Sequence, residues 1–183
     1  MRAQEYQGLA MRTSPEGHDR VLNGCLGLIG EAGEIVDLVK KWRFQSFKDT
    51  PFPKEKLVEE CGDVLWYCAE LLQGLGWDVG KLWESAYAHL VPRANIPDIA
   101  TAAARIARAA VKPFNMIYEV PISERTRHQR AIEMTGEVMY AVYELLRYHC
   151  ATNIETAMAI NIGKLRKRYP DGFDPERSMN RNE

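Results

Sequence analysis

Two pairs of acidic residues, each with its members three positions apart, are the side chains of this sequence best placed for chemistry. Glu31 and Glu34 form the first pair, and Glu60 and Asp63 form the second. Residues three apart lie on one face of an α-helix, so each pair can direct two carboxylates toward one point. Two such helices packed together make an oxygen-rich group that suits a hard cation such as Mg²⁺ or Mn²⁺. The spacing therefore predicts a divalent-cation site.

The alternative is that these acids belong to a solvated helix surface. Glu31 and Glu34 lie in the apolar stretch GLIGEAGEIV, and Glu60 and Asp63 lead directly into VLWYCAELL. Charged groups in such surroundings need a partner, because burying an unpaired charge is costly. The spacing alone leaves both interpretations open, and the apolar surroundings favour the cation site.

Helices are the elements that must position these residues. Apolar residues recur at helical spacing, and strand patterns are nearly absent. Pro and Gly residues fall between the apolar segments, where they end helices. The sequence predicts an all-α fold, with helices near residues 19–43, 54–75, 78–90, 96–112, 123–149 and 152–168.

Four glycines, at positions 24, 27, 30 and 33, recur every three residues in the first long predicted helix. Each lowers helix stability by about 1 kcal/mol relative to alanine, so another interaction must compensate. We expect another helix to approach closely along this stripe. A phosphate-binding loop is excluded, because no strand precedes the glycines and no Gly-Lys-Ser/Thr follows them.

Composition and charge set limits on the partners of the chain. Its 183 residues include 24 Lys plus Arg and 25 Asp plus Glu, so the formal net charge is -1. This balance gives no overall electrostatic attraction to nucleic acid or to an anionic membrane. The chain shows neither a membrane-spanning apolar run nor a signal-peptide pattern at its start. We expect a cytoplasmic protein with no membrane partner and no specific nucleic-acid partner.

An internal repeat organises the chain. Residues 56–66 align without gaps on residues 130–140, a shift of 74 positions, and a shift of 72 places Val39 and Lys40 on Val111 and Lys112. We predict two tandem repeats, at 1–92 and 93–168, followed by a tail at 169–183. In the second repeat the first acidic pair is replaced by Ala103 and Ile106, and the second pair by Met134 and Glu137, so the acidic group is lost.

Three segments resemble the signature blocks of MazG-like nucleoside triphosphate pyrophosphohydrolases of the compact phage and bacterial type. They are GLIGEAGEIVDLVKKW, KEKLVEECGDVLWYCAELLQGLGW and NIGKLRKRYPDGF. The resemblance implies a helical bundle of the all-α NTP pyrophosphatase type. It also implies Mg²⁺-dependent cleavage of a (d)NTP between its α and β phosphates, giving (d)NMP and pyrophosphate. The metal ligands implied are Glu31, Glu34, Glu60 and Asp63.

The sequence departs from the family pattern near the acidic pairs. The family often has an additional acid just before the first ligand, where this chain has Gly30. Glu59 competes with Glu60 as a ligand, because Glu59 and Asp63 are also close on a helix. We prefer Glu60 on the motif spacing, which leaves Glu59 as a supporting or surface residue. Either Glu34 or Glu59 can serve as the general base, and the sequence does not choose between them.

A larger departure is the stretch of residues 93–151, which separates blocks that are usually contiguous. The second repeat keeps Asn161 and Lys164 of the third block, whereas the first repeat has Ala86 and His89 at the matching places. We therefore expect one composite site per chain, with the cation held by the first repeat and the phosphates by the second.

Basic residues near the end of the chain fit the phosphate side of this site. The cluster consists of Lys164, Arg166, Lys167, Arg168, Arg177 and Arg181. Arg offers forked donors and Lys a point charge to a triphosphate. We predict that Asn161, Lys164, Arg168, Tyr169 and Arg177 contact the substrate, with Tyr169 a candidate for stacking on the base and Lys164 stabilising the departing pyrophosphate. The alternative is a solvated tail that binds nucleic acid loosely.

Other activities of the same helical superfamily stay open. They are a dimeric dUTPase-like activity and a phosphoribosyl-ATP pyrophosphohydrolase activity. A non-catalytic nucleotide-binding assembly module is the alternative from another class, and the eroded second repeat favours it. The single-copy relatives associate through their helices, so we expect a homodimer.

Overall fold

The computed structural model describes residues 1–45, 50–87 and 95–179, and within these ranges the chain is all-α, with no strand. Its elements are α1 (Ala3–Met11), α2 (Arg20–Phe44), α3 (Lys54–Gly74), α4 (Val79–Tyr87), α5 (Ile99–Ala110), α6 (Lys112–Tyr118), α7 (Glu124–Leu145), the π-helical turn η1 (Leu146–Cys150), α8 (Ile154–Arg168) and α9 (Pro175–Met179). The predicted all-α class is confirmed.

Each of the six predicted helices is present within the described residues, and positions 88–90 of the helix predicted at 78–90 lie outside them. Helices α1, α6 and α9 were not predicted. The helix predicted at 96–112 ends at Ala110, and α6 starts at Lys112. Pro113 does not end helical structure here, because it lies in the first turn of α6, where a missing N–H leaves no intrahelical bond unmade. This proline therefore begins a helix instead of lying in a connection between helices.

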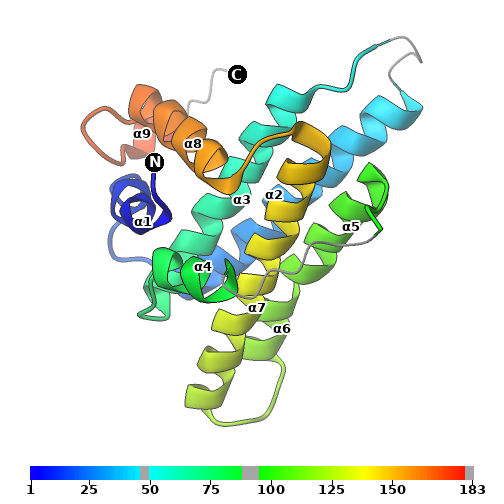
Figure 1. Cartoon of the computed structure of the whole chain (residues 1–183). Coiled ribbons are helices and arrows are strands. Elements are labelled where there is room, and N and C mark those ends of the chain that lie inside the picture. Colours follow the sequence, from blue (N-terminus) through cyan, green and yellow to red (C-terminus); the bar gives the residue numbers. More distant parts are fainter. Residues whose placement is uncertain (46–49, 88–94, 180–183) are drawn as a thin grey trace.

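Four helices, α2, α3, α5 and α7, form the main bundle (Figure 1), and α2 and α3 lie side by side along most of their length. The core between them contains Leu28, Leu65, Leu71, Ile106 and Met139, each fully buried. Burial of a side chain of this size contributes about 1.5–3 kcal/mol relative to exposure. The apolar face of α3 is therefore held in the bundle, and this orients its acidic residues.

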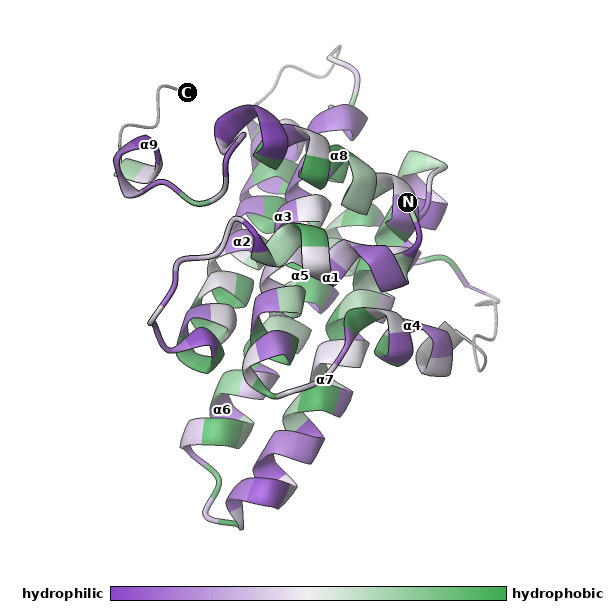
Figure 2. Ribbon diagram, turned by 90° about the vertical axis from the view of Figure 1, so that its left-hand side faces the viewer, coloured by the Kyte–Doolittle hydropathy of each residue, from purple (hydrophilic) through white to green (hydrophobic). Residues whose placement is uncertain are grey.

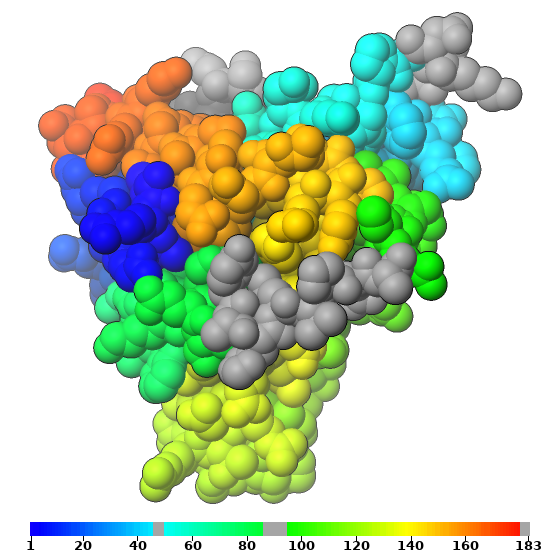
Figure 3. All heavy atoms as spheres, in the orientation of Figure 1, coloured from blue at the N-terminus to red at the C-terminus, as the bar shows by residue number. Residues whose placement is uncertain are grey.

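The short helices connect the two halves of the chain. Helix α8 packs on α3, α4 packs on α7, and α1 contacts both α4 and α8. Figure 3 shows α1 and α8 adjoining each other on the surface, although they stand at opposite ends of the sequence. Each half thus has two long helical segments followed by a shorter helix that packs on the long helix of the other half. The last helix of each predicted repeat therefore packs on the other repeat.

A buried carboxylate fixes the connection between α1 and α2 onto α3. Glu70 is fully buried and accepts hydrogen bonds from Arg20 Nη1 at 3.0 Å and from Ser14 Oγ at 3.0 Å. His18 Nε2 lies 2.5 Å from Glu70 Oε1. A buried carboxylate needs such partners, because an unpaired buried charge is costly. Residues 12–19 are thereby held against the C-terminal half of α3.

Polar residues cover the outer ends of the helices. Figure 2 shows the first turns of α7, residues 124–130, as a mainly hydrophilic segment that extends beyond the body of the bundle. Among the described residues, no helix is long and apolar enough to cross a lipid bilayer.

Candidate functional site

The candidate site is built on the close, antiparallel contact of α2 with α3. A Cβ added to Gly27 would lie 2.0 Å from the Tyr67 ring, and one added to Gly24 would lie 2.7 Å from the backbone of Leu71. Gly24 faces Leu71, and Gly27, further along α2, faces Tyr67, which comes earlier in α3. This order is the pattern of antiparallel helices. The close approach predicted for the glycine stripe is confirmed at these two positions.

The same prediction is wrong for Gly30 and Gly33. A Cβ added to either residue would meet nothing within 4 Å, and both residues are exposed. The approach of α3 covers only one edge of the stripe, because a three-residue repeat drifts around a helix of 3.6 residues per turn. Gly30 and Gly33 therefore leave the surface of α2 open beside the acidic residues.

Three of the four predicted ligands converge. Glu31, Glu60 and Asp63 each offer one carboxylate oxygen, and these oxygens lie within 4.8 Å of one another. Glu60 is 8% exposed, and the other two are partly buried. We call these three residues the acidic cluster. Their all-oxygen donor set and partial burial fit a hard divalent cation that bridges α2 and α3.

Glu34 stands apart from the acidic cluster. The antiparallel register that pairs Gly27 with Tyr67 places Glu34 opposite Glu60, but Glu34 is exposed and its carboxylate lies outside the group of three. Its negative charge still acts on Glu31, because it is among the charges that raise the pKa of Glu31. Glu34 is therefore on the solvent side of the cluster, within the electrostatic reach of Glu31.

Burial and neighbouring negative charges both raise the pKa of Glu31. Burial, followed by the charges of Asp63 and Glu60, raises the pKa of Glu31 from 4.5 to about 7, and Lys164 acts in the opposite direction. A carboxyl group held among like charges resists ionisation. A divalent cation would relieve this repulsion, so the three carboxylates of the acidic cluster fit such an ion.

Two lysines and one amide already contact the cluster. Lys56 Nζ lies 2.9 Å from Glu60 Oε1. Asn161 Nδ2 donates to Asp63 Oδ1 at 2.8 Å, and Lys164 Nζ donates to Asp63 Oδ2. Asn161 and Lys164 belong to α8, in the second half of the chain. The structure thus brings the first-half acids and the second-half donors together, as the composite site requires.

Gly62 allows α8 to approach α3 this closely. A Cβ at this position would lie 2.9 Å from Asn161 Cβ and 3.0 Å from the carbonyl oxygen of Ala157. Gly62 was not predicted to matter for the approach of α8. A glycine inside a predicted helix, directly between two predicted ligands, was the signal that could have identified it.

Tyr6 was also missed. This residue of α1 is fully buried, and its hydroxyl donates to Asn161 Oδ1 at 2.9 Å. Because the oxygen of the Asn161 amide accepts this bond, its nitrogen faces Asp63. No local pattern relates residue 6 to residue 161, so only the fold shows the connection.

The remaining predicted site residues lie outside the cluster. The Glu59 side chain is 42% exposed and lies 3.6 Å from Lys56 Nζ. Arg168 and Arg177 are exposed, and Arg177 Nη1 donates to the carbonyl of Arg168 at 3.3 Å. Tyr169 is 6% exposed, with its ring centroid 5.8 Å from that of Phe173. Its ring is therefore part of the core rather than a surface on which a base can stack. His89 and Arg181 lie outside the described residues.

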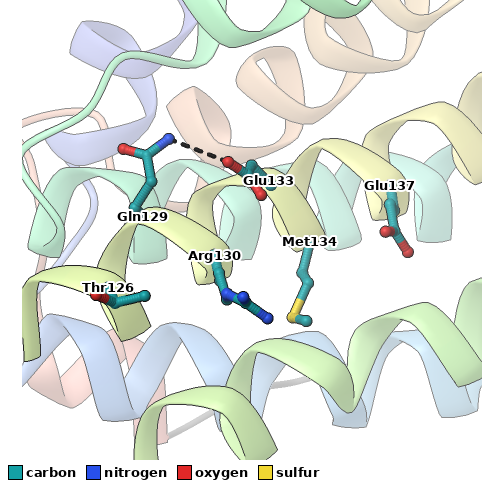
Figure 4. A pocket seen from close by; sticks show the side chains of 6 residues that line it. All are labelled: Thr126, Gln129, Arg130, Glu133, Met134 and Glu137. Carbon is teal, nitrogen blue, oxygen red and sulfur yellow. Dashed lines mark hydrogen bonds between the residues drawn. The ribbon is translucent and has the colours of Figure 1, made fainter. Parts of the chain in front are cut away.

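The second half has a groove where the first half has the acidic cluster. It has a volume of about 370 Å³ and is lined by Thr126, Gln129, Arg130, Glu133, Met134 and Glu137 (Figure 4). Under the 74-residue shift, Met134 stands in the place of Glu60, and a thioether is a poor ligand for a hard cation. Glu133 accepts a hydrogen bond from Gln129 at 3.3 Å. Among the described residues, this groove does not bring three carboxylates together as the acidic cluster does.

The predicted counterparts of Glu31 and Glu34 do not face this groove. Ala103 and Ile106 are 2% and 0% exposed and lie in the core, and the residue that meets Glu137 is Lys112, at 2.6 Å. The partner of Glu137 therefore comes from the start of α6, and not from the position on α5 that the 72-residue shift gives. A lysine ammonium thus stands beside the carboxylate that corresponds to Asp63.

A comparison with known proteins shows a partial similarity to a phage protein. The Gene 37 protein of Mycobacterium phage L5 is 41% identical to this chain over 71 residues, which are 38% of this chain. The match spans 60% of the length of the phage protein. No protein-family model matches the chain, and no solved structure matches it.

Proposed function

We propose that this protein is a divalent-cation-dependent nucleoside triphosphate pyrophosphohydrolase. Water and a (d)NTP would be converted to (d)NMP and pyrophosphate by cleavage between the α and β phosphates. The observation that carries the proposal is the meeting of Glu31, Glu60 and Asp63 with Lys164. Carboxylates that hold a cation, next to an ammonium that can pair with phosphate, form the combination that such a reaction needs.

Each residue has a role that follows from its position. Glu31, Glu60 and Asp63 would hold Mg²⁺ or Mn²⁺, with Asn161 orienting Asp63. When bound, the cation would neutralise phosphate charge and lower the pKa of the attacking water. Lys164, which reaches Asp63 from α8, would balance the charge that develops on the pyrophosphate.

The proton of the attacking water needs an acceptor. Glu34 and Glu59 both lie outside the acidic cluster, and a carboxylate that is not bound to a cation is free to act as a base. Glu34 is the stronger candidate, because it is opposite Glu60 on the open side of α2. Arg168 is one helical turn from Lys164 and on the same side of α8, where it can contact the outer phosphates.

A pyrophosphate-release assay tests the proposal. The full chain is incubated with each common dNTP and NTP, with Mg²⁺ or with EDTA, and the products are resolved by chromatography. We expect Mg²⁺-dependent formation of a nucleoside monophosphate and pyrophosphate. The same assay includes dUTP and phosphoribosyl-ATP. Activity confined to one of these two substrates, or nucleotide binding without turnover, would identify one of the alternative functions instead. Release of orthophosphate would refute cleavage between the α and β phosphates.

A further inference from the structure

Asp63 is the carboxylate of the acidic cluster whose two oxygens are both engaged. Oδ1 accepts the bond from Asn161 Nδ2 at 2.8 Å, and Oδ2 accepts the bond from Lys164 Nζ. A cation bound to the cluster would share this carboxylate with the Lys164 ammonium. Two positive charges on one small carboxylate repel each other, so cation binding and the Lys164 bond oppose each other.

The two partners of Asp63 differ in their freedom to move. Asn161 is 1% exposed, and its amide oxygen is held by the Tyr6 hydroxyl. The Lys164 side chain is 32% exposed and carries its charge on a flexible four-carbon stem. Lys164 can therefore leave Asp63 by rotating its own side chain, whereas Asn161 cannot leave without disturbing α1.

We infer that Lys164 is a displaceable counter-ion of the acidic cluster, which makes cation binding and phosphate binding depend on each other. The inference rests on the proposed function. When a cation binds to the cluster, the ammonium leaves Asp63 Oδ2, and a phosphate oxygen beside the cation accepts its hydrogen bond instead. The cation alone binds weakly because it must displace Lys164 without compensation, and the phosphate supplies that compensation. By linkage, the cation strengthens phosphate binding by the same factor.

The second half of the chain supports the pairing of a lysine with the carboxylate at the place of Asp63. Glu137, the counterpart of Asp63, pairs with Lys112 Nζ at 2.6 Å. There the neighbouring ligands are absent, and a lysine ammonium satisfies the carboxylate. In both halves, a lysine ammonium from another helix thus pairs with the carboxylate at this place of the predicted repeat.

The test compares two titrations of the full chain by calorimetry. One uses Mn²⁺ alone, and the other uses a preformed Mn²⁺–tripolyphosphate complex, which carries phosphates but no base. We expect Lys164→Met to bind Mn²⁺ roughly tenfold more tightly than the wild type and the complex roughly tenfold more weakly, which is the loss of one charged hydrogen bond in each direction. Loss of folding would weaken both affinities, so it cannot shift them in opposite directions.

Two further variants control the comparison. Lys164→Arg keeps the charge and should leave both affinities near those of the wild type. Lys112→Met removes the lysine that pairs with Glu137, away from the acidic cluster, so both affinities should be unchanged.

The outcomes separate the inference from the proposed function. Mn²⁺ affinity that is unchanged or lower in Lys164→Met overturns the inference. So does a higher Mn²⁺ affinity without weaker binding of the tripolyphosphate complex. If Asp63→Asn abolishes Mn²⁺ binding while Lys164→Met behaves as the wild type, the cation site stands and only the role of Lys164 fails. If no form of the protein binds Mn²⁺ in either titration, the proposed function fails as well.

Discussion

Replacing Gly62 with alanine tests whether the close approach of α8 to α3 builds the candidate site. The added Cβ would lie 2.9 Å from Asn161 Cβ and 3.0 Å from the Ala157 carbonyl oxygen, where ordinary contacts begin at 3.4 Å. The second of these atoms is backbone, so a side-chain rotation cannot relieve the overlap. Helix α8 must therefore move away from α3 by about half an ångström, because packed interiors have no spare room.

The cost in stability is small because two effects oppose each other. Alanine is better than glycine in a helix interior by about 1 kcal/mol. Overpacking costs about 1–3 kcal/mol. The free energy of unfolding should thus fall by at most about 2 kcal/mol, which lowers the melting temperature by about 4–8 °C in a domain of this size. The variant should remain folded.

The cost in activity is larger. Asn161 and Lys164 both move with α8, and their bonds to Asp63 are charge-assisted and worth about 1.5–3 kcal/mol each. Losing one of them should reduce Mg²⁺-dependent pyrophosphate release by about tenfold to 100-fold. Binding of Mn²⁺ should not be lost, because Glu31, Glu60 and Asp63 all belong to α2 and α3.

Gly136→Ala is the matched control for Gly62→Ala. Gly136 is the repeat counterpart on α7, but its added Cβ would be 3.5 Å from Leu82 Cδ1, which is an ordinary contact. This variant should be as active as the wild type and up to about 1 kcal/mol more stable. Equal activity and equal stability of the two alanine variants would refute the reasoning about α8.

Four other predictions follow from the same contacts. Tyr6→Phe leaves the buried Asn161 oxygen without its donor, so urea denaturation should show a loss of about 1–3 kcal/mol; wild-type stability would contradict this. The pKa of Glu31 is raised to about 7, so the folded protein in EDTA binds a proton that the unfolded chain releases. Its free energy of unfolding should fall as pH rises from about 5 to about 8, and Glu31→Gln should flatten this trend. Asp63→Asn should lower turnover by orders of magnitude, whereas Glu137→Gln should leave it unchanged, and comparable rates would refute the assignment of the site. Light scattering at micromolar concentration should show a homodimer, and a stable monomer would oppose that expectation.

Local spacing in the sequence was sufficient to predict six of the helices and the face of the acidic residues. Glu60 and Asp63 share a face of α3 because they are three residues apart, and Glu31 faces them because Gly24 and Gly27 bring α2 close. Helical periodicity is a property of the backbone, so it can be read from residues near one another in the chain. The preference for Glu60 over Glu59 came from the resemblance to the family motif, and the structure places Glu60 in the acidic cluster.

Only the tertiary structure decided which of these side chains meet. It left Glu34 outside the cluster, buried the Tyr169 ring, and placed Lys112 rather than Ala103 beside Glu137. It also brought Tyr6 to Asn161, across almost the whole length of the chain. Such contacts depend on how far each helix slides along its neighbour and on where small residues allow backbones to approach, and no short stretch of sequence contains that information. The sequence by itself determined the faces that carry the chemistry, and the packing of α8 and α1 on α3 determined which of those faces form the site.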